Sequence, residues 1–249
     1  MAQARIIAAI ATRKGTRKYN CDAARIHQLP GTGTVAAVIV DGIGNTPKKA
    51  AFSRLAAECI ARVSARRDPL LGILHGAALN TAPPGTLIPD DGVAAVAVAA
   101  PNRRTAIAWT GDALISGWTG EKLVRRSTLQ TMGTWLRAWG GTAVTLHPSE
   151  GPDETVSVDR GALVLDDLAR STLGRCSIDT VPLCFVEDPV LILTSDGAHG
   201  QIPHQLMEDL AREHADTPRA LADAIVAAAE PDKTGYRDDA TAIVMKTRT

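Results

Sequence analysis

The stretch AVIVDGIG, residues 37–44, joins an apolar run to an Asp-Gly pair and is the segment that most constrains the fold. The apolar residues 35–40 predict a buried β-strand, and Asp41-Gly42 predicts the turn that ends it. Asn45-Thr46 then supplies a capping side chain, and Pro47 suits the first turn of a helix. Apolar residues recur at helical spacing after them, at Phe52, Leu55, Ala56, Cys59 and Val63. The segment therefore predicts a buried strand, a turn and a helix with one face on a core.

The remaining apolar runs predict further strands and helices without a steady βαβ alternation. We expect strands at residues 6–11, 93–99, 105–110, 113–119, 183–186, 190–194 and 240–245, and helices at 70–79, 203–214 and 217–229. Turns at Asn102-Arg103 and Gly111-Asp112 predict antiparallel hairpins between the middle strands. Trp135 and Trp139 are expected on a short helix that ends at Gly140-Gly141. Strands that cluster, followed by helices that cluster, favour an α+β layered domain, and no linker divides residues 1–249 into more than one domain.

The composition excludes several classes of protein. The 27 basic and 27 acidic residues give a formal net charge of zero, so nothing favours a nucleic acid or an anionic membrane as the main partner. The apolar run at residues 6–11 is too short for a secretory core segment or a membrane span. The four cysteines are far apart and form no CxxC pair, which argues against a thiolate zinc site and favours a cytoplasmic protein.

Four aspartates stand where a predicted strand begins or ends: Asp41, Asp112, Asp196 and Asp238. Side chains at strand ends can converge at one rim of a sheet, and carboxylates gathered there repel one another unless cations neutralise them. Oxygen ligands without His or Cys favour Mg²⁺ or Mn²⁺ over zinc. Each aspartate also has an ordinary interpretation, as a turn residue or a solvated loop residue.

Six segments in the same order along the chain give these aspartates a family context. The segments are GTRKYNCD (15–22), AVIVDGIG (37–44), AWTGDALISGW (108–118), RSTLG (170–174), LILTSDGAHGQI (191–202) and RDDATAIVM (237–245). With these segments the chain resembles the metal-dependent protein phosphatases of the type 2C (PPM) family, in particular compact bacterial members. The resemblance implies a four-layer αββα sandwich, in which two antiparallel sheets are flanked by helices.

The resemblance also implies a metal centre of two Mg²⁺ or Mn²⁺ ions. Asp41 corresponds to the aspartate that bridges both ions, and the carbonyl of Gly42 to a ligand of the second. Asp196 and Asp238 correspond to the remaining ligands of the first ion. Asp22 is expected to act through a water molecule.

Two more positions complete the implied site. Asp112, with Asp196, corresponds to the pair that binds a third, weaker ion in bacterial members. Arg17 corresponds to the arginine that binds the substrate phosphate, which its planar guanidinium suits. Ser195 is expected to be structural, and His199 a helix-entry or surface residue.

The sequence departs from the family pattern at several places. Cys21 stands where the family usually has glutamate, which removes one carboxylate near the metals. Asp239 replaces an asparagine and leaves open whether it or Asp238 is the metal ligand. Residues 127–159, where the family has a mobile flap, match poorly.

The resulting hypothesis is a serine/threonine protein phosphatase, a hydrolase in which a metal-bridging water attacks phosphoserine or phosphothreonine. We expect it to be a cytoplasmic monomer that acts in signalling. Its partner would be a phosphoprotein substrate, with no nucleic acid and no membrane. Two alternatives remain open from the sequence. One is a non-catalytic or weakly active relative that binds a regulatory partner, and the other is a phosphatase within a partner-switching module.

Overall fold

Two antiparallel sheets of five strands each form the centre of the computed structural model, which describes residues 6–83, 86, 89–140, 143–146, 154–157 and 165–247. The first sheet has the order β1 (Ile6–Arg13), β12 (Ala240–Thr247), β11 (Val190–Thr194), β6 (Leu114–Trp118) and β7 (Leu123–Arg125). The second sheet has the order β10 (Leu183–Val186), β5 (Thr105–Thr110), β4 (Gly92–Ala99), β3 (Val35–Gly42) and β2 (Asp22–Gln28).

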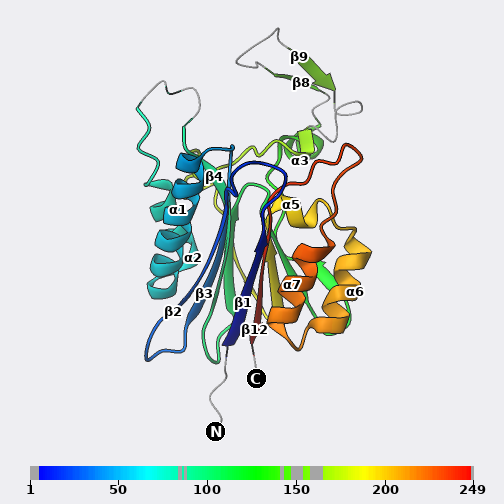
Figure 1. The fold of residues 1–249 in the computed structure, drawn as a ribbon. Helices are drawn as coiled ribbons and strands as arrows, with labels where there is room; N and C mark the ends of the chain where they lie inside the picture. Colours follow the sequence, from blue (N-terminus) through cyan, green and yellow to red (C-terminus); the bar gives the residue numbers. More distant parts are fainter. Residues whose placement is uncertain are drawn as a thin grey trace.

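Helices cover both outer faces of this pair of sheets. Figure 1 shows α1 (Pro47–Arg66) and α2 (Pro69–Ala77) on the outer side of the second sheet. It shows α6 (His204–His214) and α7 (Pro218–Ala228) on the outer side of the first sheet. The αββα sandwich implied by the resemblance is therefore confirmed. None of the helices in the described ranges has the length and apolar character needed to cross a bilayer.

Smaller elements gather at one end of the sandwich. They are α3 (Met132–Trp139), the paired strands β8 (Ala143–Leu146) and β9 (Glu154–Ser157), and the short helix α5 (Asp196–His199). The predicted short helix around Trp135 is confirmed, and Gly140 ends it in the left-handed conformation that glycine adopts readily.

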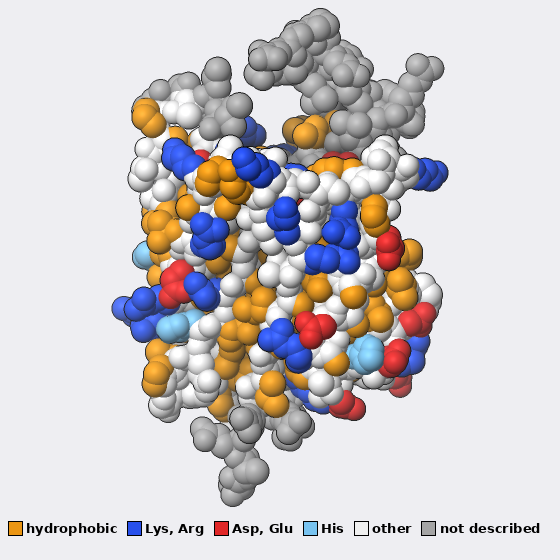
Figure 2. All heavy atoms as spheres, in the orientation of Figure 1, with side chains coloured by type: hydrophobic (Ala, Val, Ile, Leu, Met, Phe, Trp, Pro, Cys, Tyr) orange, Lys and Arg blue, Asp and Glu red, His pale blue; other side chains and the backbone are white. Residues whose placement is uncertain are grey.

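Apolar side chains form a layer between the sheets and one more under each helix pair. Val35, Ala37 and Ile39 of β3 face the first sheet, whereas Val38 and Val40 face α1. This alternation explains why residues 35–40 are apolar without interruption, since both faces of the strand are buried and successive side chains point to opposite faces. On the face seen in Figure 2, basic and acidic side chains are interspersed, in agreement with the net charge of zero.

The strand register brings the ends that carry aspartates to the same end of the sandwich. In the second sheet, Asp22 at the start of β2 lies opposite Asp41 near the end of β3. In the first sheet, Thr194 at the end of β11 pairs with Leu114 at the start of β6 and with Ala242 of β12. Asp112, Asp196 and Asp238 therefore lie next to strand ends of the first sheet. Asp22 and Asp41 lie at strand ends of the second sheet, at the same end of the sandwich.

One predicted connection is wrong. Residues 105–110 and 113–119 do not form a hairpin, because β5 belongs to the second sheet and β6 to the first. Gly111 has a positive φ of 83° and lies close to the side chain of Val93, so the Gly111-Asp112 turn carries the chain around a tight corner between the sheets. A Gly-Asp pair between two buried strands looks the same in the sequence whether the strands form a hairpin in one sheet or belong to two different sheets.

The N-cap of α1 gives a direct test of the predicted helix start. The hydroxyl of Thr46 accepts a hydrogen bond from the amide of Lys49 at 3.2 Å, and Pro47 follows it. Thr217 holds the same position before α7 and also precedes a proline, but its side chain makes no capping hydrogen bond. We expect Thr46→Ala to lower the free energy of unfolding by about 1 kcal/mol, and Thr217→Ala to leave it almost unchanged. Urea unfolding of both variants would contradict this expectation if the two losses were equal.

Candidate metal centre

The carboxylate of Asp41 lies at the centre of a cluster of acidic side chains, of which Asp112 is buried and Asp22, Asp41 and Asp196 are half-buried. Burial and the nearby carboxylates of Asp196, Asp22 and Asp112 raise the pKa of Asp41 well above its ordinary value. These residues come from both sheets, because Asp22 and Asp41 belong to the second, whereas Asp112 and Asp196 flank the first. The structure thus brings together four of the residues that the sequence analysis singled out, within electrostatic reach of one another.

The pKa values of two further members of the cluster are raised. Burial, opposed by hydrogen bonds from Thr241 and Ser195, raises the pKa of Asp22 to about 8. The Ser195 hydroxyl donates to the Asp22 carboxylate at 2.7 Å and accepts from the Thr241 amide at 3.0 Å. Ser195 therefore holds the cluster in place, which agrees with its expected structural role. Burial, together with the charges of Asp196 and Asp167, raises the pKa of Asp112 to about 7.

Asp167 is a member of this environment that the sequence analysis did not identify. Burial and the charges of Asp196, Asp166 and Asp238 raise its pKa. In the sequence it follows the apolar residues 162–165 and lies just before RSTLG. An Asp-Asp pair beside a motif of the implied family was the only signal available there.

Arg17 lies beside Asp238 at the rim of the cluster. Its guanidinium forms an ion pair with the Asp238 carboxylate, and its Nε donates to the hydroxyl of Tyr236 at 2.6 Å. Its Nη1 also donates to the carbonyl of Gly44 at 3.3 Å. Although burial lowers it, the hydrogen bond to Tyr236 and the charge of Asp238 raise the pKa of Arg17, so the group is cationic. Tyr236 is a second residue near the site that the sequence analysis did not find.

The structure distinguishes the two adjacent acids that the sequence left undecided. Asp239 is only 3% exposed and accepts hydrogen bonds from the amides of Gly15 at 2.8 Å and Cys21 at 2.9 Å. Asp238 instead faces Arg17, and burial with the charge of Asp196 raises its pKa. Asp239 therefore fixes the backbone on both sides of Arg17, whereas Asp238 pairs with Arg17 within electrostatic reach of Asp196.

Gly42 and Cys21 lie together where β3 leaves the second sheet. The Gly42 amide donates to the Cys21 carbonyl at 3.1 Å, and a Cβ on Gly42 would collide with the hydroxyl of Ser53. Glycine is therefore required here by close packing against α1. Cys21 is buried, its Sγ lies 3.9 Å from the Thr46 carbonyl, and burial raises the pKa of its thiol. A neutral, inert thiol at this position is consistent with these contacts.

The donor set of the cluster fits a hard divalent cation. It consists of aspartate carboxylate oxygens. Burial and nearby charges raise the pKa values of Asp41, Asp22 and Asp112, and a cation would remove the repulsion among these groups. Within the described ranges, no three Asp, Glu, His or Cys side chains form a ready-made group that could hold a metal ion. Asp22 is turned to Ser195 and Asp238 to Arg17, so the carboxylates interact without surrounding a common point. Their chemistry suits a cation, and the binding of one would require these side chains to reorient.

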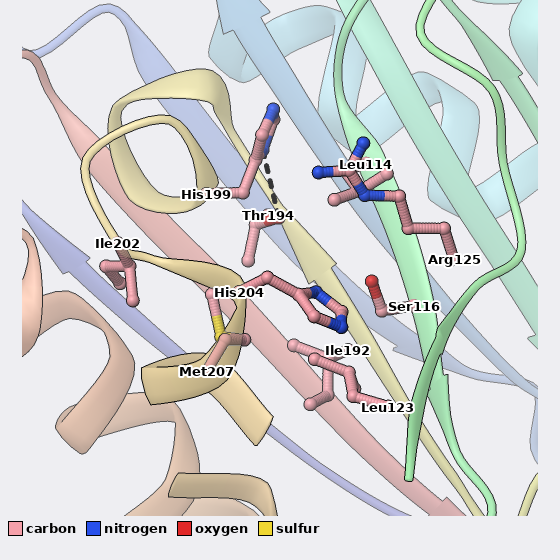
Figure 3. Close-up of a pocket in the computed structure, with 10 residues that line it drawn as sticks. All are labelled: Leu114, Ser116, Leu123, Arg125, Ile192, Thr194, His199, Ile202, His204 and Met207. Atoms are coloured by element: carbon pink, nitrogen blue, oxygen red, sulfur yellow. Dashed lines mark hydrogen bonds between the residues drawn. The ribbon is translucent and has the colours of Figure 1, made fainter. Parts of the chain in front are cut away.

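His199 borders a small cavity beside this cluster (Figure 3). The cavity has a volume of about 30 Å³, and its walls come from β6, β7, β11 and the start of α6. The Nδ1 atom of His199 lies 3.2 Å from the hydroxyl of Thr194, and burial lowers the pKa of the ring to about 4. The expected assignment of His199 to a helix entry or the surface is wrong, because it ends α5 and is half-buried. The cavity has room for one or two water molecules and not for a peptide.

Solved structures share this architecture. The chain aligns over 96% of its length with 97% of the PPM Ser-Thr phosphatase MsPP from Mycobacterium smegmatis in complex with cacodylate, with a TM-score of 0.68 and 16% identity. It aligns over 97% of its length with 99% of the S. agalactiae serine/threonine phosphatase, with a TM-score of 0.72 and 14% identity. It also matches the catalytic domain of the serine threonine protein phosphatase PstP in complex with two manganese ions, over all of both chains, with a TM-score of 0.63 and 15% identity.

These matches define the class of fold. The chain has the fold of the PPM serine/threonine phosphatases, as the sequence resemblance implied. No protein-family model matches the sequence, and no curated protein matches it.

Proposed function

We propose that the chain is a metal-dependent serine/threonine protein phosphatase, a hydrolase that acts on phosphoserine and phosphothreonine esters. The observation that carries this proposal is the meeting of carboxylates from both sheets, Asp41 and Asp22 with Asp112 and Asp196, in a fold shared with phosphatases. Since a fold alone hosts many activities, the carboxylate cluster beside the cationic Arg17 is the stronger support.

The proposed metal ligands are the carboxylates of Asp41, Asp196 and Asp238 and the carbonyl of Gly42, with Asp22 acting through water. Asp112, with Asp196, would hold a third, weaker ion. The proposed ions are Mg²⁺ or Mn²⁺, two in the main site; the PstP catalytic domain was solved in complex with two manganese ions. Such ions supply an activated water molecule and charge stabilisation for the phosphate.

Arg17 has the geometry of a phosphate-binding group. Its guanidinium lies between Asp238 and the Gly44 carbonyl, and Tyr236 fixes its Nε. A substrate phosphate would replace Asp238 as its anionic partner, and the planar fork could then contact two phosphate oxygens. Among the described residues of the cluster, neither the thiol nor the serine hydroxyl is free for attack, because Cys21 packs against Thr46 and Ser195 is held by Asp22 and Thr241. Hydrolysis by direct attack of water is the chemistry that agrees with these contacts.

Two measurements on the wild-type protein test this function. In calorimetry, we expect Mn²⁺ to bind with measurable heat, because each ion removes repulsion among the buried carboxylates. We also expect Mn²⁺ to support hydrolysis of phosphoserine and phosphothreonine peptides, and a chelator to abolish it. A protein that gives no heat at millimolar Mn²⁺ and releases no phosphate would refute the proposal and favour a non-catalytic binding protein.

The remaining features of the proposal concern context. We propose one domain over residues 1–249, acting as a cytoplasmic monomer on a phosphoprotein met by diffusion. We further propose that residues 127–159 serve as a flap that influences substrate choice. In support of this, α3, β8 and β9 lie at the same end of the sandwich as α5, which begins at Asp196 (Figure 1).

A further inference from the structure

A groove of about 350 Å³ lies at the end of the second sheet remote from the acidic cluster. It is bounded by the β2–β3 and β4–β5 turns, the junction of α1 and α2, and the edge strand β10. Strand β3 runs from Val35 at this end to Gly42 at the other. At ~3.3 Å per residue, roughly 23 Å separate the groove from the cluster. The groove is therefore a separate feature, and a ligand in it would not touch the proposed metal site.

The floor of the groove is a part of the second sheet that α1 and α2 leave uncovered. On β10, Cys184 and Val186 point into the layer between the sheets, so Leu183 and Phe185 point outward. Leu183 is 41% exposed and Phe185 is 54% exposed. Phe185 pairs with Ala106 of β5 and Leu183 with Ala108, so both continue the apolar surface that the helices bury elsewhere. Two large apolar side chains in one such concave surface are typical of an interaction site.

Four arginines line the same groove: Arg66, Arg67, Arg103 and Arg104. Arg104 stacks over the ring of Phe185, 5.4 Å from its centroid, and lies 3.9 Å from the carboxylate of Glu187. Among the described residues, no carboxylate forms an ion pair with the other three. The one acid in the lining, Asp68, caps α2 by accepting from the Leu71 amide at 2.8 Å. The four arginines outnumber the nearby carboxylates of Asp68 and Glu187, so the groove is positively charged in a chain whose net charge is zero.

Strand β10 also provides a backbone edge. It pairs with β5 on one side, and within the described part of the chain no strand pairs with its other side. An unpaired strand edge next to apolar side chains on one face of that strand is the arrangement that accepts an extended peptide as an added strand.

We propose that this groove docks an extended, acidic peptide segment of a partner protein, with apolar side chains at alternate positions. The carboxylates would pair with Arg66, Arg67 and Arg103, and the alternate apolar side chains would pack on Leu183 and Phe185. The backbone edge of β10 favours a peptide over a nucleic acid, since an extended peptide presents amides and carbonyls in the alternating pattern that matches a strand edge. The volume of about 350 Å³ suits a few side chains of such a peptide.

Fluorescence anisotropy with the full chain and two labelled peptides tests this proposal. The probe is Glu-Glu-Leu-Glu-Phe-Glu-Glu, and its matched control is Glu-Glu-Ser-Glu-Ser-Glu-Glu, which has the same charge. We expect saturable binding of the probe, and binding of the control weaker by about tenfold or more. Phe185→Ser and Arg103→Glu should each weaken probe binding by about tenfold, and Phe185→Ser should reduce the difference between the peptides.

Matched control variants distinguish docking of the peptide in the groove from nonspecific electrostatic attraction. Lys122→Glu makes the same charge change at an exposed turn of the first sheet and should leave probe binding unchanged. Equal affinity for the two peptides, or equal losses in Lys122→Glu and Arg103→Glu, would overturn the proposal. So would tighter binding of an oligothymidine with the same sensitivity to Arg103→Glu, or a self-association that Phe185→Ser abolishes without peptide. None of these measurements uses turnover, so they stand apart from the proposed enzyme activity.

Discussion

Asp41→Asn and Asp196→Asn are each expected to lower Mn²⁺-supported phosphopeptide hydrolysis by a factor on the order of a thousand. Both substitutions keep the size of the side chain and remove a charged oxygen ligand from the proposed centre, and a bound metal is worth several kcal/mol to hydrolysis of this kind. Asp179→Asn, at an exposed position in a turn, is the matched control and should retain wild-type activity. The rates would be compared at saturating Mn²⁺.

Stability measurements distinguish a lost ligand from a lost fold. Without metal, Asp41→Asn should unfold at the same or a higher urea concentration than the wild type, because it removes one charge from a cluster in which Asp196, Asp22 and Asp112 raise its pKa. With Mn²⁺ at about a hundred times its dissociation constant, the wild type should gain about 2.7 kcal/mol, and the variant should gain much less. Wild-type turnover in either asparagine variant would contradict the proposed roles.

Asp239→Ala is expected to lower the free energy of unfolding by about 3 kcal/mol, the largest stability loss that we predict. The Asp239 carboxylate is buried and satisfies the amides of Gly15 and Cys21, and its removal leaves both without a partner. An unsatisfied buried amide costs about 1–3 kcal/mol. Urea unfolding in the presence of a chelator measures the effect without a contribution from metal.

The neighbouring acid provides the matched comparison for this prediction. Asp238→Ala should change stability far less than Asp239→Ala, because its ion pair with Arg17 is partly exposed and Asp196 repels it. It should instead reduce Mn²⁺ binding and hydrolysis, since we propose Asp238 as a ligand. If Asp238→Ala were the more destabilising variant, the structural assignment of the two acids would be reversed.

The sequence predicted the features that depend on short-range chemistry. The capping side chain within Asn45-Thr46, the buried strand at residues 35–40 and the helix end at Gly140-Gly141 follow from local patterns. All are confirmed, with Thr46 as the N-cap and Gly140 as the C-cap. The sandwich followed from the family resemblance, because no local pattern states which strands pair.

The features that the sequence did not predict depend on contacts between distant segments. Strand β2 at the edge of its sheet has few apolar residues, and it is fixed by pairing with β3. The crossing at Gly111 depends on which sheet receives the next strand. The different roles of Asp238 and Asp239 become evident only when residues 15–21 fold against them.

The corner at Gly111 has a mechanical consequence. Because β5 and β6 lie in different sheets, the acidic cluster is assembled across the boundary between two halves of the sandwich, each of which contributes carboxylates. A slip of one half past the other by a single pleat would separate Asp41 from Asp196 without breaking any strand pairing. The close-packed interior between the halves, which includes Ile39, Leu193 and Ile243, resists such shear. Residues far from any phosphate thus set the spacing on which ion binding would depend.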